Sequence, residues 1–259
     1  MAIIAQKRPS APIDILTVLT HWLDHSGQSV TNNTWLSLLT VALCAVPAFA
    51  GDAFDAQRAK KDAIISQIRD RNDMVRAIKN LSPADQERDL CLALNIYFEV
   101  RNCTLTESVA SSYTVLNRYY DNDIPGLKNT KTSLCAVVFA PKQYSWTNDD
   151  VIPYPANKKL WRIAQSVSYT ILNNPRYYND HAKQFAMKHY ITRALNDSPN
   201  APKWSKSATF KIQFDNGSHV YMYMQPLPWY KNKYIIASRL KRLITKDAAE
   251  INKLITVGE

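Results

Sequence analysis

The chain has 259 residues, of which 46% are hydrophobic and 10% aromatic, a composition that predicts a packed globular core rather than a disordered chain. The formal net charge is +10, and because the charges of residues 1–50 cancel, the whole excess lies in residues 51–259. That excess suits a polyanionic partner, such as nucleic acid, anionic lipid or a wall polymer, or serves only as a soluble basic surface. With only 5 glycines and no glycine-rich phosphate loop, the sequence argues against nucleotide chemistry.

Residues 1–50 form a hydrophobic N-terminal segment. Its apolar run, from Trp35 to Ala50, is shorter than the roughly 20 residues that a membrane-spanning helix needs. The run ends in Ala48-Phe49-Ala50, which has the small-x-small form of a signal-peptidase site. We therefore expect a signal peptide or a releasable membrane anchor and an exported protein, with a buried core helix as the alternative.

Two helices are expected next. Residues 51–82 mix many charges with isoleucines at helical spacing, which indicates an amphipathic helix that is either a spacer or a packing arm. Ser82-Pro83 has the hydroxyl cap and first-turn proline of a new helix start. The helix that follows is apolar on nearly every side up to Phe98, so we expect it to be buried centrally.

The remaining elements favour a mostly helical α+β domain. Thr104-Leu-Thr-Glu107 matches a capping box that opens a helix, and another helix follows Pro155 and stops at Asn173-Asn-Pro175. From Phe210 to Tyr223 the apolar period changes to two around an Asp-Asn-Gly-Ser turn, which predicts a small antiparallel β-hairpin sheet. The tail, residues 231–259, reads as a basic amphipathic helix from Tyr234 to Thr256 that either packs on the domain or contacts an anionic envelope.

Glu99 stands out because it ends this apolar helix. An ionised carboxylate there is costly to desolvate unless it is paired or protonated. Burial raises the pKa of a carboxyl group, and a raised pKa suits a general acid near neutral pH. Arg101 and Arg118 are possible ion partners, which would make Glu99 purely structural instead.

Five sequence blocks, taken in order, resemble the SleB-like cell-wall hydrolases, a family that includes spore-cortex-lytic enzymes and many bacteriophage endolysins. The blocks are Leu94-Asn-Ile-Tyr-Phe-Glu-Val-Arg101, Val115-Leu-Asn-Arg118, Cys135 to Trp146 ending in Gln-Tyr-Ser-Trp, His189-Tyr190 with Pro202-Lys-Trp204, and His219-Val-Tyr221. Each block alone is weak, whereas the ordered set is specific. The chain departs from the family where a second acid usually follows the first, because Cys103 stands there and Asn102 replaces a glycine.

The resemblance implies a lysozyme/transglycosylase-like domain over residues 83–230 that cleaves the bond between N-acetylmuramic acid and N-acetylglucosamine in peptidoglycan. With no second acid on this segment, Glu99 would act alone, first as acid and then as base, leaving a 1,6-anhydro end and needing no metal or cofactor. We expect several of the aromatic residues, among them Tyr97, Tyr144 and at least one tryptophan, to be core. The expected substrate-binding residues are Tyr97, Gln143, Ser145, Trp146, His189, Tyr190, Trp204 and His219.

The sequence alone leaves several alternative functions open. Asp149 or Asp150 would serve as a second acid in a hydrolytic muramidase. Glu99, His189 and His219 would be the ligands of a zinc amidase, if the hairpin brings the histidines together. Loss of the second acid also allows a non-catalytic wall-binding or virion protein, whereas no motif supports nucleic-acid binding. Spacing cannot choose which two of three cysteines, Cys91, Cys103 and Cys135, form a disulfide.

Overall fold

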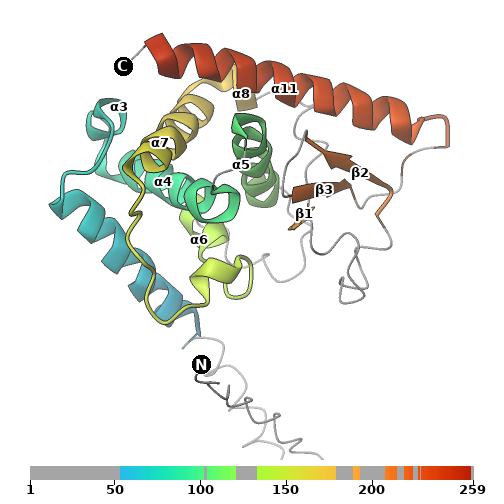
Figure 1. Ribbon diagram of the computed structural model, residues 1–259. Coiled ribbons are helices and arrows are strands. Elements are labelled where there is room, and N and C mark those ends of the chain that lie inside the picture. Colours follow the sequence, from blue (N-terminus) through green and yellow to red (C-terminus); the bar gives the residue numbers. More distant parts are fainter. Residues whose placement is uncertain are drawn as a thin grey trace, which may run out of the picture. The chain divides into compact units, whose positions relative to one another are not determined.

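The computed structural model describes residues 53–101, 104–120, 133–178, 189–192, 208–214, 219–223, 227 and 229–257 (Figure 1). Residues 1–51 and 52–259 separate into two units, and the first, with the predicted signal or anchor segment, lies outside the described residues. The described part is mostly helical with a small antiparallel sheet, which confirms the predicted class. None of its helices is long and apolar enough to cross a membrane.

The central helix is α4 (Pro83–Asn95). Its start is the one predicted, because the Ser82 hydroxyl accepts a hydrogen bond from the Asp85 amide at 3.2 Å and Pro83 occupies the first turn. Every side chain from Asp89 to Asn95 is buried, as expected for a helix that is apolar on nearly all sides. Helix α4 packs against α7 (Lys158–Asn173) and α6 (Leu134–Val138).

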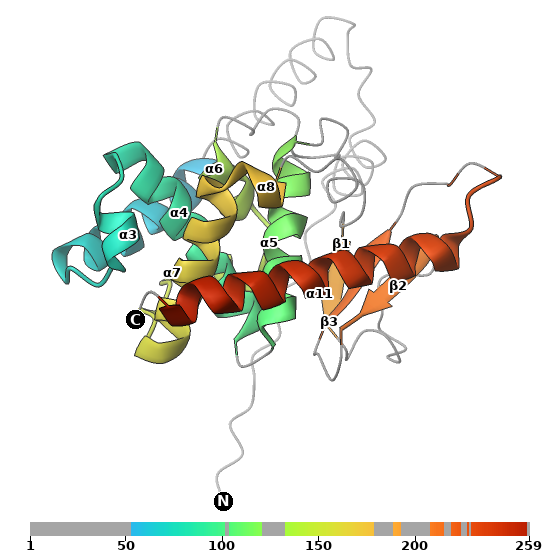
Figure 2. The ribbon, with the colours of Figure 1, turned by 90° about the horizontal axis from the view of Figure 1, so that it is seen from above.

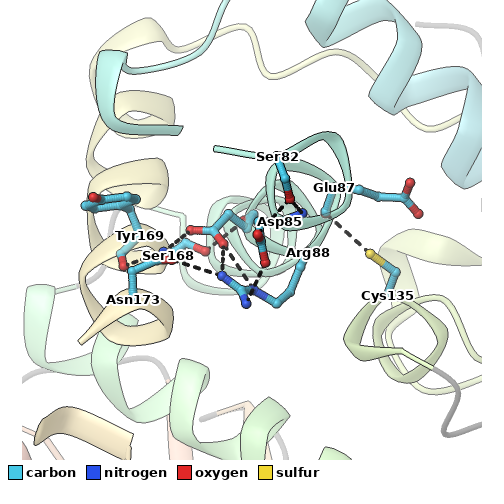
Figure 3. A network of polar contacts seen from close by, with 9 residues as sticks. Ser82, Asp85, Glu87, Arg88, Cys135, Ser168, Tyr169 and Asn173 are labelled. Atoms are coloured by element: carbon cyan, nitrogen blue, oxygen red, sulfur yellow. Dashed lines mark hydrogen bonds and ion pairs between the residues drawn. The ribbon is translucent and has the colours of Figure 1, made fainter. Parts of the chain in front are cut away.

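A polar network joins α4 to α7 (Figure 3). Arg88 pairs with Asp85 at 3.0 Å and also donates to the Asn173 side chain at 3.0 Å. The Ser168 hydroxyl donates to the carbonyl oxygen of Asp89 at 2.7 Å.

On the other side of α4, a disulfide between Cys91 and Cys135 ties the helix to α6, with the two Cα atoms 5.3 Å apart. This pairing resolves the choice that spacing left open, and Cys103 lies outside the described residues.

The segment before α4 is part of the packed core. A helix over residues 53–70 buries Ile64, Ile65 and Ile68, which are 2%, 3% and 0% exposed. Lys61 on this helix forms an ion pair with Glu87 of α4 at 2.5 Å. The short helix α3 (Arg76–Lys79) follows and also contacts α4 and α7. Of the two interpretations of this segment, burial favours the packing arm over the spacer.

Helix α5 (Leu105–Tyr120) is buried along most of its length, from Thr106 to Arg118. It begins with the predicted capping box, in which the Glu107 amide donates to the Thr104 hydroxyl and the Thr104 amide donates to the Glu107 carboxylate, both at 3.3 Å. The caps at Ser82 and Thr104 therefore fix where the two helices on either side of Glu99 begin.

The sheet has three strands in the order β1-β3-β2, with β1 (His189–Thr192), β2 (Phe210–Gln213) and β3 (His219–Tyr223). Strands β2 and β3 pair antiparallel as the predicted hairpin, and β1 adds to the free side of β3. The Tyr221 hydroxyl donates to the Glu107 carbonyl oxygen at 3.1 Å, which attaches the sheet to α5.

The C-terminal helix α11 (Lys233–Val257) extends the predicted range by one residue at each end. It packs against α5, α7 and β2, as both ribbon views show (Figures 1 and 2). The Tyr113 hydroxyl of α5 donates to the Asp247 carboxylate at 2.8 Å. Arg176 in the short helix α8 (Pro175–Tyr178) pairs with Glu250. The tail helix thus packs on the domain along one face, which includes the buried Leu240, Ile244, Ala248 and Ile251.

Candidate active site

Glu99 lies on η1 (Ile96–Val100), a single π-helical turn that continues α4. Such turns are rare and occur frequently at functional sites. The Glu99 side chain is half-buried. The next exposed residue, Arg101, has φ 50° and ψ −119°, a backbone conformation that disfavours any residue with a Cβ. The chain therefore changes direction sharply just after the candidate catalytic residue, at a cost of about 1–3 kcal/mol.

Tyr144 and Arg118 are buried neighbours, and the charge of Glu99 acts on the Tyr144 hydroxyl. Burial raises the pKa of the Tyr144 hydroxyl, the Arg118 guanidinium opposes the rise, and the charge of Glu99 adds to it. Tyr144 is 2% exposed and Arg118 7% exposed, and the guanidinium carbon lies 5.0 Å from the centre of the Tyr144 ring. The charges of Arg118 and Glu99 thus both act on the Tyr144 hydroxyl. Of these neighbours, the sequence had indicated Arg118 as a partner for Glu99 but not Tyr144.

A cavity of about 510 Å³ opens beside the π-helical turn. Three of its lining residues, Tyr97, Phe98 and Arg101, flank Glu99 in sequence, although Glu99 itself is not among the described residues that line it. Two more, Ser145 and Trp146, are substrate-binding residues expected from the sequence. The remaining lining residues are Asp149, Pro153 and Leu160.

The aromatic part of the cavity is built on Trp146. This indole is 6% exposed, its Nε1 donates to the Asn95 side chain at 3.4 Å, and the Phe98 ring stacks on it with centroids 5.0 Å apart. Trp146 is therefore chiefly a core residue with one face covered. The half-buried ring of the pair is that of Phe98, which lies next to Glu99. Phe98 was not among the substrate-binding residues expected from the sequence.

The part of the cavity lined by Pro153 and Leu160 is connected to the segment before α4. Tyr154, next to Pro153, donates its hydroxyl to the Asp73 carboxylate at 2.6 Å, and Trp161 Nε1 donates to the Asp73 carbonyl oxygen at 3.1 Å. Burial and the Asp73 carboxylate raise the pKa of Tyr154 to about 12, so this hydroxyl stays protonated. Asp73 therefore holds Tyr154 and Trp161, the sequence neighbours of the lining residues Pro153 and Leu160.

Tyr97 has a structural role beside its place in the cavity. Its hydroxyl accepts a hydrogen bond from the Asn157 amide at 3.0 Å, and its ring meets Trp161 edge to face with centroids 6.0 Å apart. Tyr144 is core as well, so the expectation that Tyr97, Tyr144 and at least one tryptophan serve packing is met. Tyr97 also lines a second cavity of about 250 Å³, whose far side is the end of α11.

The structure does not bring all the expected substrate-binding residues together. Gln143 is partly buried and does not line the 510 Å³ cavity. Its backbone N–H donates to the Ala140 carbonyl oxygen at 3.1 Å. Trp204 lies outside the described residues, and the side chains of His189, Tyr190 and His219 are not described.

The two histidines lie on paired strands, as the zinc alternative requires, but at opposite ends of the ladder. His189 is opposite Met222 and His219 is opposite Thr192, which separates the two backbone positions by roughly 10 Å along the strands. The β2–β3 hairpin was predicted from the sequence, whereas the pairing of β1 with β3 was only one possibility and its register was not predicted. Among the described residues, no group of three histidine, cysteine, aspartate or glutamate side chains is arranged to hold a metal ion.

Comparison with family models, curated proteins and solved structures gives no match to this chain. The candidate functional site therefore consists of Glu99 on its π-helical turn and the side chains of the adjoining cavity.

Proposed function

We propose that this protein cleaves the glycan strands of peptidoglycan with Glu99 as its acid/base, within a lysozyme/transglycosylase-like domain. The observation that carries the proposal is the position of Glu99 on a π-helical turn whose neighbours Tyr97, Phe98 and Arg101 line a 510 Å³ cavity. Clefts that bind sugars combine flat apolar faces with polar groups that fix orientation, and this cavity has both kinds of side chain.

The chemistry needs one carboxyl group that changes role. As an acid, Glu99 donates its proton to the oxygen that links muramic acid C1 to the next sugar, and the C1–O bond breaks. As the resulting carboxylate, it removes the proton from the muramoyl C6 hydroxyl, whose oxygen then bonds to C1. The products are a 1,6-anhydro end and a free hydroxyl, and no water is consumed. General acid and base catalysis of this kind contributes about 10²–10⁴-fold to a rate.

Tyr144 and Arg118 would act on Glu99 rather than on the sugar, because both are buried and neither lines the 510 Å³ cavity. The Arg118 cation and the Glu99 charge both act on the Tyr144 hydroxyl, so Arg118 is the cation that would stabilise the charge that develops in the second step. The nearby Tyr144 hydroxyl, which burial keeps protonated, offers a polar group in that same low-dielectric space. We propose both as positioning residues.

A hydrolytic muramidase is the second candidate function, and the position of Asp149 supports it. Asp149 lines the cavity next to Ser145 and Trp146 and is exposed, so it is available to activate a water molecule. The product then carries a reducing end instead of the 1,6-anhydro ring.

The disulfide supports the proposal that the protein works outside the cytoplasm, in the periplasm or cell wall. Disulfides form and persist in oxidising compartments, and the Cys91–Cys135 bond joins the helix that carries η1 to α6. A signal peptide or releasable anchor in residues 1–50 would supply the export route.

The test is mass spectrometry of purified peptidoglycan digested with the protein. We expect 1,6-anhydromuramoyl products, and Glu99→Gln should lower their rate of formation by about a hundredfold or more while pelleting with the wall is retained. The matched control is Glu87→Gln, which changes a glutamate of α4 on the side of Lys61, away from the cavity, and should keep activity. Undiminished lysis by Glu99→Gln would remove the catalytic assignment, and wall binding without any product would identify a non-catalytic wall-binding protein.

A further inference from the structure

The two ends of α11 differ in what surrounds them. From Leu240 onward, one face is covered by the domain, with Leu240, Ile244, Ala248 and Ile251 all buried. Toward the N-terminus, and in the residues just before it, large apolar side chains face solvent. Trp229 is 97% exposed, Tyr230 66%, Tyr234 71% and Ile235 52%.

These four residues form a cluster rather than isolated exposed positions. The described part of the chain has eight exposed large hydrophobic side chains, and four of them fall between Trp229 and Ile235, whereas the others are scattered. A cavity of about 430 Å³ adjoins them and is lined on its apolar side by Ile235, Ile236 and Leu243. We call Trp229, Tyr230, Tyr234 and Ile235 the Trp229 patch.

Positive charge surrounds the patch. From Trp229 to Lys246 the sequence has six basic residues and no acidic one. The Lys233 ammonium lies 5.2 Å from the centre of the Tyr234 ring, and the Lys231 ammonium lies 6.0 Å from that of Tyr230. Lys231 and Arg239 also line the cavity. Apolar and cationic side chains therefore alternate over one continuous surface.

We propose that the Trp229 patch binds the surface of an anionic lipid bilayer. Tryptophan and tyrosine favour the headgroup level because each has an apolar body and a polar tip, and lysine and arginine beside them attract anionic headgroups. A second copy of this chain is a poorer occupant, because a symmetric contact would bring two basic surfaces of like charge together. Nucleic acid would use the lysines but not the exposed Ile235 or the apolar side of the cavity.

The patch and the candidate active site lie at opposite ends of α11. The second cavity beside η1 is lined by Asn252 and Thr256, and the helix between Tyr234 and Asn252 measures roughly 27 Å. A bilayer held by the patch therefore leaves the Glu99 region open to a substrate. The proposal does not depend on the proposed function, because it concerns other residues and another ligand.

The test is co-sedimentation of the full chain with vesicles of phosphatidylcholine alone and of phosphatidylcholine mixed with phosphatidylglycerol. We expect binding to the anionic vesicles that weakens with salt and is roughly tenfold weaker for Lys231→Gln/Lys233→Gln. Trp229→Ser/Tyr234→Ser should weaken binding to a similar degree. The matched control, Lys253→Gln/Leu254→Ser, changes a basic and an exposed apolar residue at the other end of the same helix and should bind as the unmodified chain does.

Residues 1–50 are apolar and can bind lipid by themselves, so a second measurement isolates the patch. Vesicles with brominated acyl chains should quench a part of the tryptophan fluorescence, and that part should disappear in Trp229→Phe. Quenching that is the same in Trp229→Phe, or patch variants that bind as the unmodified chain does, would overturn the proposal. Self-association or nucleic-acid binding that depends on the patch, without lipid binding, would overturn it in favour of those occupants.

Discussion

The rings of Phe98 and Trp146 stack at 25° with their centroids 5.0 Å apart, which joins the residue before Glu99 to the aromatic that closes the third sequence block. Both side chains line the 510 Å³ cavity, but Trp146 is nearly inaccessible while Phe98 is half-buried. If a sugar ring packs against an aromatic face here, the accessible face belongs to Phe98.

Phe98→Leu should therefore weaken substrate binding. Leucine keeps an apolar side chain but loses the flat face, so we expect KM for a soluble glycan fragment to rise about fivefold with kcat little changed. Phe139→Leu is the control, because Phe139 also contacts Trp146, edge to face with centroids 5.4 Å apart, but does not line the cavity. Equal effects of the two substitutions on KM would mean that Phe98 acts only by packing.

Arg101→Gly should change stability and binding in opposite directions. Glycine tolerates φ 50° and ψ −119°, so relief of the backbone should raise the free energy of unfolding by about 1 kcal/mol, measured by urea denaturation. The exposed guanidinium at the cavity suits carboxylates such as those of peptidoglycan stem peptides, and its loss should raise KM for glycan fragments that carry them.

Lys142→Gly is the matched control for Arg101. Lys142 also has a positive φ, 64°, and is exposed, but it does not line the cavity. We expect a similar gain in stability with KM unchanged. If Arg101→Gly lowers stability, the guanidinium bond to the Phe98 carbonyl oxygen, at 3.2 Å, matters more than the backbone conformation.

Asp149→Asn separates the two mechanisms. If Glu99 works alone, the substitution should change kcat less than about threefold and leave the 1,6-anhydro product in place. If water is activated by Asp149, kcat should fall by about 10²-fold or more and the reducing-end product should disappear. Asp150→Asn is the control, since Asp150 neighbours Asp149 but does not line the cavity.

What the sequence could predict was local. The caps at Ser82 and Thr104 and the β2–β3 hairpin depend on residues a few positions apart, and all are present as expected. The stacking of Phe98 on Trp146 and the choice of Cys135 as the partner of Cys91 depend on how distant segments pack. The register that separates His189 from His219 is set by pairing across strands, which the composition of one strand does not determine.

Removing the disulfide should destabilise the fold that carries η1. The bond closes a loop with a sequence separation of 44, for which loss of the cross-link costs about 4 kcal/mol through the entropy of the unfolded chain. Cys135→Ala should lower the Tm accordingly and make it insensitive to reductant. Cys91→Ala/Cys135→Ala should add little to the single substitution. A Tm of the unmodified chain that does not change with reductant would contradict the pairing.

Asp89 should make the protein less stable as the pH rises toward neutrality. This carboxyl is 0% exposed, and burial raises its pKa to about 6 from 3.8, although Arg88 and Asn173 act in the opposite direction. A carboxyl whose pKa is higher in the folded than in the unfolded state stabilises the fold at low pH, and this contribution is lost as the pH rises through about 6.

The difference amounts to about 2 kcal/mol between pH 4 and pH 7, an order-of-magnitude figure from the two pKa values. Asp89→Asn should remove most of this slope, as measured by urea denaturation at a series of pH values. Asp85→Asn is the control, because Asp85 also pairs with Arg88 but its side chain is 45% exposed, so the slope should remain. The same slope in Asp89→Asn as in the unmodified chain would assign the pH dependence to other groups.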